Sequence, residues 1–309
     1  MTNNLTSKVA GDYLVVCPSK WSMPWLLRQR LHTYLIGKRI YCYKRMKSTQ
    51  KLALSLAEKN STSSFEGTVI VAERQKNATG RGGRRWISPS GGIWLSVILH
   101  PNLLSSQSML ITFLATLSVC EVLKSETGLN PRIKWPNDVI INGNKVCGIL
   151  VDVAVINETI CYAVIGIGIN VNNEPTKIIS ELSKANDNCL YGITSVKKEL
   201  GGLDFNIADI TGSLIAKLDY YYHQLQLGFH DHIIQKWKYW SEYFNKVVLI
   251  KEHNSVFEAR VEDIDHSGAL IVRTPDGMTR KVFSHDIVLE RSHPTQIHTH
   301  ELKTDCTHR

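Results

Sequence analysis

Hydrophobic positions in the first half of the chain alternate between the two-residue spacing of strands and the wider spacing of helices. Apolar or β-branched runs predict three strands, at residues 40–43, 68–72 and 93–99. Ser48 is a suitable helix N-cap, because Leu52, Ala53 and Leu56 follow it at helical spacing. A longer apolar stripe predicts a second helix over residues 105–126.

The middle of the chain has the pattern of two successive β-hairpins. The apolar run 139–141 is followed by Asn142-Gly143 and then by a second strand. Asn-Gly is favoured there because a type I′ turn needs positive φ at both central residues. A second turn at Asn157-Glu158 is expected to join residues 147–156 to residues 159–171.

The last part of the chain changes from helical to strand spacing. After a loop-rich stretch, helical patterns cover residues 205–226 and 231–243. Short strands are then predicted at 247–250, 257–261, 269–272 and 281–283. Gly268 and Pro275-Asp276-Gly277 mark turns between them, so this region predicts a small β-barrel.

These patterns divide the chain into four parts. Residues 1–35 are an N-terminal extension that we expect to be irregular, and residues 36–244 form an α/β domain. Residues 245–291 form the small barrel, and residues 292–309 are expected to be a disordered tail. The chain has no apolar stretch of about 20 residues and no apolar signal core, so we expect neither a membrane span nor secretion.

Composition narrows the class of protein without naming a function. Hydrophobic residues make up 43% and charged residues 21%, which is typical of a globular protein. The seven cysteines form no Cys-x-x-Cys pair, so neither a zinc site nor a redox motif is supported, and a reducing cytoplasm is expected. The net charge of +8 favours anionic partners such as nucleotides, nucleic acid or an acidic protein.

The first concentrated chemical signal is the segment 75–86, which reads Gln-Lys-Asn-Ala-Thr-Gly-Arg-Gly-Gly-Arg-Arg-Trp. Glycines expose backbone N–H groups, and arginines beside them suit phosphate or carboxylate binding. The spacing matches neither a P-loop nor a dinucleotide fingerprint. Taken alone, the segment is compatible with ligand binding, with a mobile surface loop or with an RNA contact.

The second signal is Lys134-Trp135-Pro136-Asn137-Asp138, followed by Lys145 and Gly148-Ile149-Leu150. A lysine near a reacting carboxylate or phosphate stabilises developing negative charge. A single lysine is more often a solvated surface residue, and Trp-Pro is more often a rigid turn. The interpretation therefore depends on the motifs taken together.

Taken together, the motifs resemble the biotin protein ligase family, also called holocarboxylase synthetases. The family pattern is roughly Gly-Arg-Gly-Arg-x-Gly-Arg-x-Trp, then Lys-Trp-Pro-Asn-Asp, then Lys-x-x-Gly-Ile-Leu. This chain has the counterparts of all three in order, preceded by Ser48-Thr49-Gln50 and followed by Gly166-Ile167-Gly168-Ile169-Asn170. The resemblance runs from about residue 36 to residue 289. It implies an α/β (α+β) domain on a mixed sheet of the class II synthetase type, followed by an SH3-like β-barrel.

Two departures from the family pattern concern ligand contacts. Counted back from Trp86, the first Gly-Arg pair of the family falls on Ala78-Thr79, so one cation is missing. Arg81, Arg84 or Arg85 are the available replacements. Gln50 stands where the family has Asn, and its longer amide would still reach the ligand.

The resemblance assigns roles residue by residue. Lys145, Arg81 and Arg84 are the expected catalytic residues. The expected biotin-binding residues are Ser48, Thr49, Gln50, Gln75, Thr79, Gly80, Arg81, Lys145 and Gly148. The expected ATP-binding residues are Arg81, Gly82, Gly83, Arg84, Trp86, Asn137, Asp138, Lys145 and Asn170. Asp138 is also the expected ligand for Mg²⁺.

The implied activity is a two-step ligase reaction with ATP and biotin as substrates and with Mg²⁺. Biotin becomes biotinyl-5′-AMP with release of pyrophosphate, and a lysine of a biotin carboxyl carrier domain then displaces AMP. The Gly/Arg segment is expected to fold over the adenylate and exclude water. A cytoplasmic location and a homodimer are further expectations, since dimers are frequent in the family.

Fewer than 40 residues precede the first predicted strand of the catalytic domain, which is too few for a winged-helix domain. We therefore expect a monofunctional ligase with no specific DNA binding and no membrane association. Lipoate–protein ligase is the nearest alternative enzyme, since it shares the fold and the adenylate chemistry. A non-catalytic regulator that binds biotin or nucleic acid is the alternative from another class.

Overall fold

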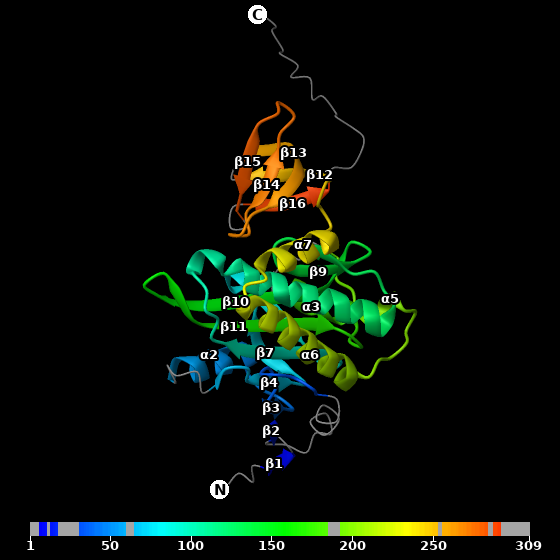
Figure 1. Ribbon diagram of the computed structural model, residues 1–309. Helices are drawn as coiled ribbons and strands as arrows, with labels where there is room; N and C mark the ends of the chain where they lie inside the picture. The colour runs from blue at the N-terminus through cyan, green and yellow to red at the C-terminus, as the bar shows by residue number, and fades with distance from the viewer. Residues whose placement is uncertain are drawn as a thin grey trace, which may run out of the picture.

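The computed structural model describes residues 6–10, 13–17, 31–59, 65–184, 192–252, 255–283 and 287–291. Within these ranges a nine-stranded mixed sheet forms the larger part of the molecule and a five-stranded antiparallel sheet the smaller part (Figure 1). An α/β domain followed by a small β domain was predicted from the sequence, and the structure confirms this architecture.

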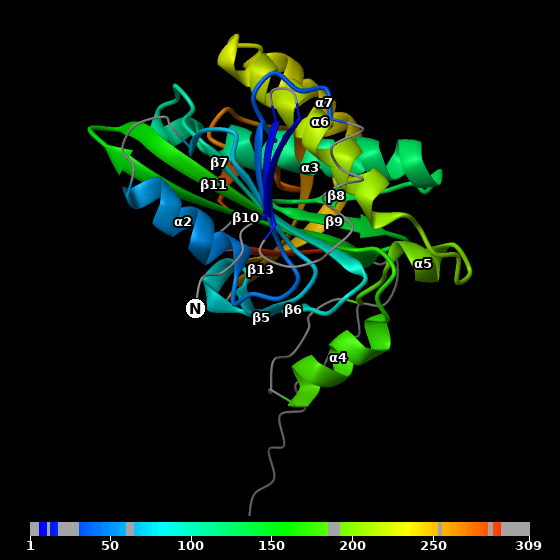
Figure 2. The same cartoon turned by 90° about the horizontal axis from the view of Figure 1, so that it is seen from below.

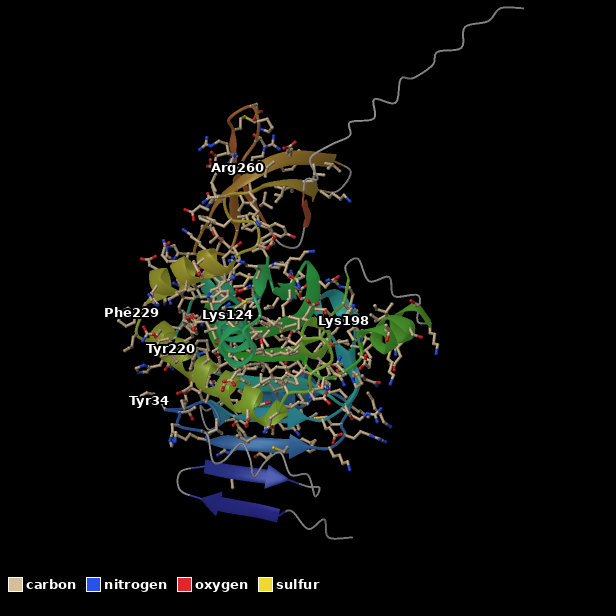
Figure 3. The ribbon with its side chains drawn as sticks, turned by 90° about the vertical axis from the view of Figure 1, so that its right-hand side faces the viewer. Tyr34, Lys124, Lys198, Tyr220, Phe229 and Arg260 are labelled. Carbon is tan, nitrogen blue, oxygen red and sulfur yellow. The ribbon has the colours of Figure 1, made fainter. Side chains whose placement is uncertain are left out.

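The large sheet has the strand order β1-β2-β3-β4-β7-β11-β10-β9-β8. Its strands are β1 (Thr6–Ala10), β2 (Tyr13–Cys17), β3 (Arg39–Tyr43), β4 (Val69–Ala72), β7 (Gly92–Leu99), β8 (Arg132–Lys134), β9 (Asp138–Ile141), β10 (Asn144–Ile156) and β11 (Thr159–Asn170). β3 pairs in parallel with β2 and β4, whereas the other neighbours are antiparallel. In Figure 3 the first strands lie one below another at the lower edge of the sheet.

The two predicted hairpins are present. Asn142 and Gly143 have φ values of 50° and 79° and join β9 to β10. Asn157 and Glu158 have φ values of 49° and 65° and join β10 to β11. Positive φ at both central residues of each turn matches the right-handed twist of the paired strands.

Successive side chains of the sheet point to opposite faces, and each face is covered by different helices. The helices α3 (Met109–Thr127), α6 (Ile207–Gln226) and α7 (His230–Trp240) share one core with Leu95 and Val97 of β7. The helix α2 (Thr49–Lys59) packs on the opposite face, where Ala53 contacts the cluster that contains Ile98. Figure 2 shows α2 on one side of the strands and α3, α6 and α7 on the other.

One described helical segment, Ser105–Thr127, is long and apolar enough to cross a membrane. It contains α3, and 72% of its most apolar window is buried inside the protein. Residues on every side of α3 are buried, because the helix lies between the sheet and the pair α6 and α7. Its apolar composition is that of a core helix.

The smaller sheet has the order β15-β14-β13-β12-β16. Its strands are β12 (Val247–Glu252), β13 (Ser255–Ile264), β14 (Leu270–Arg273), β15 (Thr279–Val282) and β16 (Ile287–Arg291). Trp135 of the catalytic domain donates from Nε1 to the carbonyl oxygen of Gly268 at 3.1 Å. Lys238 of α7 forms an ion pair with Asp263 at 2.5 Å. These contacts join the small sheet to the catalytic domain.

Three stretches differ from their predicted structure. The N-terminal extension was expected to be irregular, but β1 and β2 continue the large sheet beyond β3. The loop-rich stretch before α6 contains α4 (Pro175–Lys184) and the short α5 (Val196–Glu199). The Gly/Arg segment is a hairpin of β5 (Gln75–Thr79) and β6 (Arg85–Ser88) with a 3-10 turn at Arg81–Gly83. The expected disordered tail, 292–309, lies outside the described residues.

Candidate functional site

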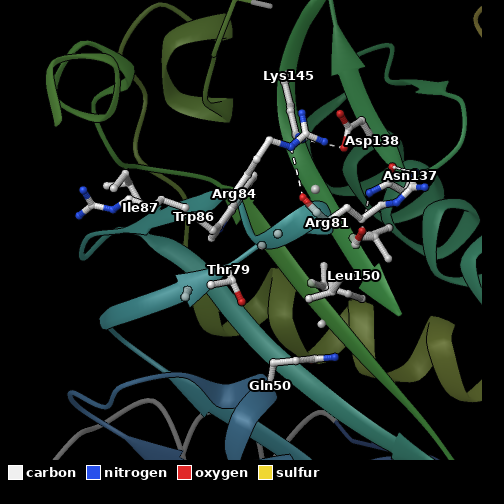
Figure 4. A pocket seen from close by; sticks show the side chains of 18 of the residues that line it. Gln50, Thr79, Arg81, Arg84, Trp86, Ile87, Asn137, Asp138, Lys145 and Leu150 are labelled. Carbon is white, nitrogen blue, oxygen red and sulfur yellow. Dashed lines mark hydrogen bonds and ion pairs between the residues drawn. The ribbon is translucent and has the colours of Figure 1, made fainter. Parts of the chain in front are cut away.

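A cavity of about 580 Å³ opens on the face of the large sheet that carries α2. Its walls are the start of α2, the β5–β6 hairpin, residues 134–138, the strands β10 and β11, and α4. Figure 4 shows Gln50 at one end of this cavity and Lys145 with Asp138 at the other. The two ends differ in chemistry.

At the first end, buried amide and hydroxyl groups form one connected set, which we name the amide network. Its members are Thr49, Gln50, Gln75, Ser88 and Ser96. Gln75 accepts at Oε1 from the backbone N–H of Thr49 at 2.7 Å and donates from Nε2 to Ser88 at 3.1 Å. Ser96 Oγ lies 2.9 Å from both Thr49 Oγ1 and Gln50 Oε1. The network holds the two glutamine amides in fixed orientations.

Gln50 has a defined orientation because its amide nitrogen faces two acceptors. Nε2 donates to Asp152 Oδ2 at 2.9 Å and to the carbonyl oxygen of Val164 at 3.0 Å. A primary amide has two N–H groups, so both are used within the protein. Only Oε1, which also accepts from Ser96, keeps a free lone pair for a ligand N–H. Gln50 therefore reaches the cavity as an acceptor.

Three glycines on the strands allow the cavity to be deep. A Cβ at Gly168 would lie 2.4 Å from Trp86 Nε1, and one at Gly148 would lie 2.9 Å from Trp86 Cζ3. A Cβ at Gly166 would lie 2.5 Å from Gln50 Oε1. Gly148 and Gly168 are direct partners across β10 and β11, so the indole of Trp86 rests on a surface without side chains.

Trp86 is held on this surface by neighbouring side chains. Its ring meets Trp94 edge-on, with centroids 6.4 Å apart, and the Lys145 ammonium lies 5.2 Å from the ring centroid. Its Nε1–H is buried without a partner among the described residues. The hairpin strand β6 thus brings an aromatic plane and a free donor to the sheet.

At the second end of the cavity, Lys145 and Arg81 lie near one carboxylate, that of Asp138. Lys145 Nζ lies 2.7 Å from Asp138 Oδ1, and both side chains are partly exposed to the cavity. Arg81 donates to Asn137 Oδ1 at 3.2 Å, and Asn137 donates to the carbonyl oxygen of Ile149 at 2.6 Å. The pKa of Arg81 is lowered from its usual value, because partial burial lowers it more than the nearby Asp138 raises it. Arginine keeps its charge in proteins, so this end has the charge and the N–H donors that suit an anion.

The departures Ala78-Thr79 fall on β5 of the hairpin. Ala78 pairs with Trp86 and Thr79 with Arg85 in the β5–β6 register. Arg81, Arg84 and Arg85 all line the cavity. Arg84 donates from Nε to the carbonyl oxygen of Arg81 at 3.2 Å, which holds the turn together. The hairpin thus supplies three arginines to the cavity, although Thr79 stands where the family pattern has a further arginine.

Asn170, an expected ATP-binding residue, lines the cavity at the end of β11. It is 3% exposed, it donates to the carbonyl oxygen of Thr194 at 3.1 Å, and it accepts from Asn173 at 2.9 Å. These bonds tie the end of β11 to the segment before α5. In this structure Asn170 shapes the wall of the cavity.

Neither a metal cluster nor a nucleophilic thiol is evident among the described residues. No group of three or more His, Cys, Asp or Glu side chains with metal-binding geometry occurs in that part of the chain. Asp138 is the carboxylate that lines the cavity beside the cations. Burial raises the pKa of the neighbouring Cys147 thiol, so this thiol stays protonated at neutral pH.

The structure brings the predicted site residues together. The cavity lining includes Ser48, Thr49, Gln50, Gln75, Thr79, Gly80, Arg81, Gly82, Arg84, Trp86, Asn137, Asp138, Lys145, Gly148 and Asn170. Of the predicted residues, Gly83 alone does not line it. Gly83 is exposed in the hairpin turn, with φ at 74°.

Sequence reasoning missed several residues of the site. Ser96 lies in an apolar strand, and Asp152 is distant in sequence from Gln50, so neither carried a local signal. Ile178 and Leu182 of α4 line the cavity together with Ile193. Their i, i+4 spacing is a helical signal that the reading of this stretch as loop-rich overlooked.

This combination of mixed sheet, glycine surface and arginine hairpin defines a class of ligase. Residues 42–170 match the biotin/lipoate A/B protein ligase family, and residues 244–289 match the biotin protein ligase C-terminal domain. The bifunctional ligase/repressor BirA of Bacillus subtilis is 30% identical over 280 residues, which cover 90% of this chain and 82% of that protein. The chain belongs to the biotin protein ligase family and is a ligase.

Two further proteins support this membership. The biotin–[acetyl-CoA-carboxylase] ligase of Paracoccus denitrificans is 29% identical over 235 residues, which cover 75% of this chain and 93% of that protein. The structure of the biotin protein ligase from Aquifex aeolicus in complex with biotin and ATP has a TM-score of 0.63 to this chain at 25% identity. It covers 82% of this chain and 99% of that one.

Proposed function

We propose that this protein joins biotin to ATP, giving biotinyl-5′-AMP and pyrophosphate, and then transfers the biotinyl group to a lysine of a biotin carboxyl carrier domain. One observation carries the proposal. A single cavity has neutral hydrogen-bonding groups at the Gln50 end and cations at the Lys145 end. Biotin has the matching polarity, with a neutral ureido ring at one end and a carboxylate at the other.

The amide network suits a ureido ring. Such a ring has two N–H donors and one carbonyl acceptor. Gln50 Oε1 offers an acceptor to an N–H, whereas the second N–H of Gln75 Nε2 is a donor toward the carbonyl. A ligand without these groups would leave buried polar atoms unpaired, which penalises its binding. The network therefore favours biotin over lipoate, whose dithiolane ring has neither group.

The cationic end suits the reacting anions. Lys145, Arg81 and Arg84 reduce the repulsion between the biotin carboxylate and the phosphates of ATP, so the carboxylate oxygen can attack the α-phosphorus. Trp86, Gly82 and Asn137, which line the cavity, are proposed to hold the nucleotide. In the second step the carrier amine attacks the acyl carbon, AMP leaves with the electron pair, and the amine loses a proton.

Asp138 fits the expected Mg²⁺. Mg²⁺ is usually bound by one or two carboxylates together with substrate phosphates, which this cavity accommodates. When bound, the ion would neutralise phosphate charge. In the structure Asp138 pairs with Lys145 at 2.7 Å, so Asp138 also orients the lysine.

Exchange of labelled pyrophosphate into ATP tests the first step. We expect exchange that depends on biotin, with no exchange when lipoate replaces it. Exchange with lipoate alone would assign the chain to lipoate activation. Failure with both substrates, together with tight biotin binding, would identify a non-catalytic binding protein. Transfer of labelled biotin to a purified carrier domain tests the second step.

A further inference from the structure

A group of exposed cations lies around the β5–β6 hairpin; apart from Arg85, which also lines the cavity described above, its members lie outside that cavity. We name this group the basic rim. Its members are Arg45, Lys47, Lys51, Arg74, Lys76 and Arg85, all of them exposed. They come from three segments: the connection before α2, the first turn of α2, and the hairpin with the residue before it.

Backbone hydrogen bonds hold two of these segments side by side. Met46 donates to the carbonyl oxygen of Arg74 at 3.1 Å, and Lys76 donates to that of Met46 at 3.1 Å. Asn77 donates to the carbonyl oxygen of Lys47 at 2.9 Å. Met46 is partly buried against the α2 cluster, so Arg45 and Lys47 on either side of it point outward. The concentration of charge is therefore a product of the fold.

The rim cations have few anions to balance them. Lys51, Arg74, Lys76 and Arg85 line a second cavity of about 280 Å³, in which Glu181 is the one carboxylate. Within the described residues, none of the rim side chains takes part in an ion pair. Like charges held close together without partners cost stability, and a partner of opposite sign relieves that cost.

The second cavity shares one wall with the first. The residues that line both are Gln75, Ala78, Thr79, Arg85, Trp86 and Ile87. A macromolecule bound to the basic rim would therefore be separated from the proposed reaction site only by the β5–β6 hairpin. In the proposed function, the only macromolecule that must reach this position is the carrier domain, because its lysine has to enter the first cavity.

We propose that the basic rim is the docking surface for an acidic face of the carrier domain, next to the lysine that is modified. This inference rests on the proposed function. Cations at the edge of an interface act mainly by accelerating encounter and setting orientation, and their effect falls with salt. Single-stranded nucleic acid would need aromatic side chains for base stacking, but Trp86, the aromatic lining the second cavity, lies against the sheet.

The test uses the double variant Lys47→Gln/Lys76→Gln, whose side chains lie outside the first cavity. The matched control is Lys124→Gln/Lys198→Gln, which removes two exposed charges elsewhere. Both variants should retain biotin-dependent pyrophosphate exchange, which needs no carrier. Biotin transfer to a carrier domain is then measured at about 0.05 M and about 0.5 M salt, where the Debye length is roughly 14 Å and roughly 4 Å.

At low salt we expect kcat/KM for the carrier to fall roughly 10-fold in the rim variant and less than about 2-fold in the control. At high salt the difference should nearly vanish, while kcat at saturating carrier stays unchanged. Equal transfer by both variants at low salt would overturn the proposal. Absence of biotin-dependent pyrophosphate exchange in the unsubstituted protein would instead contradict the proposed function. If the rim variant transfers normally but loses salt-sensitive binding to a DNA duplex, the rim binds nucleic acid and the docking proposal is wrong.

Discussion

Replacement of Gly168 by alanine tests whether the indole of Trp86 must lie flat on the sheet. The added Cβ would be 2.4 Å from Trp86 Nε1 and 2.6 Å from Cε2, closer than such atoms approach in proteins. Gly168 lies within β11 and does not have positive φ, so alanine is compatible with its backbone. The indole, and with it the β6 side of the hairpin, therefore has to move away from β10 and β11.

The expected size of the effect follows from the cost of overpacking. Forcing an extra methyl group into a filled site costs about 1–3 kcal/mol. If that cost acts on the conformation that binds ligand, affinity or adenylate formation should fall by a factor of about 5 to 150. The free energy of unfolding should fall by no more than the same amount, about 1–3 kcal/mol, because the partly exposed indole can move off the sheet.

The assay is biotin-dependent pyrophosphate exchange, with thermal unfolding as the control for folding. Gly148→Ala should have a smaller effect, since its Cβ would be 2.9 Å from the nearest indole atom. Combining Gly168→Ala with Trp86→Phe should restore part of the loss, because the smaller ring leaves room for the methyl group. Exchange in Gly168→Ala within twofold of the unsubstituted protein would show that the position of the indole does not matter.

Further variants test the cation, the amide network and the support of the catalytic domain. Lys145→Ala should leave thermal unfolding unchanged and slow pyrophosphate exchange about 100-fold or more, and normal turnover would remove Lys145 from the chemistry. Asp152→Ala removes one acceptor from the Gln50 amide, which lies 2.9 Å away. Calorimetry should then show biotin affinity roughly 5-fold lower or weaker still, with little change in the exchange rate at saturating biotin, whereas unchanged affinity would contradict the proposed orientation. The carboxylate of Asp219, on α6, accepts hydrogen bonds of 2.7–2.9 Å from the backbone N–H groups of residues 34–36. Asp219→Asn should weaken these bonds. Urea unfolding should show that the free energy of unfolding falls by about 1–3 kcal/mol, while pyrophosphate exchange is retained. An unchanged urea midpoint would show that the Asp219 hydrogen bonds do not stabilise the domain.

Local signals in the sequence predicted the structure correctly where that structure depends on only a few neighbouring residues. Asn142-Gly143 and Asn157-Glu158 marked both hairpin turns correctly, because positive φ depends on the residues in the turn. Helix α6 was expected over 205–226 and runs from Ile207 to Gln226, since its apolar stripe is long and regular. In contrast, β1 and β2 are five residues each, and they join the sheet because β2 pairs with β3 and β1 pairs with β2.

The sequence by itself determined the family, the order of the domains and most of the residues that line the cavity, because motifs keep their identity whatever their place in space. The tertiary structure decided how those residues meet. The contact of Gln50 with Asp152 spans 102 positions, and that of Gln50 with Ser96 spans 46. The basic rim likewise exists only because two segments pair through Met46 and Arg74. Such contacts arise from strand order and register, which are set by burial over the whole sheet and cannot be read from any local pattern.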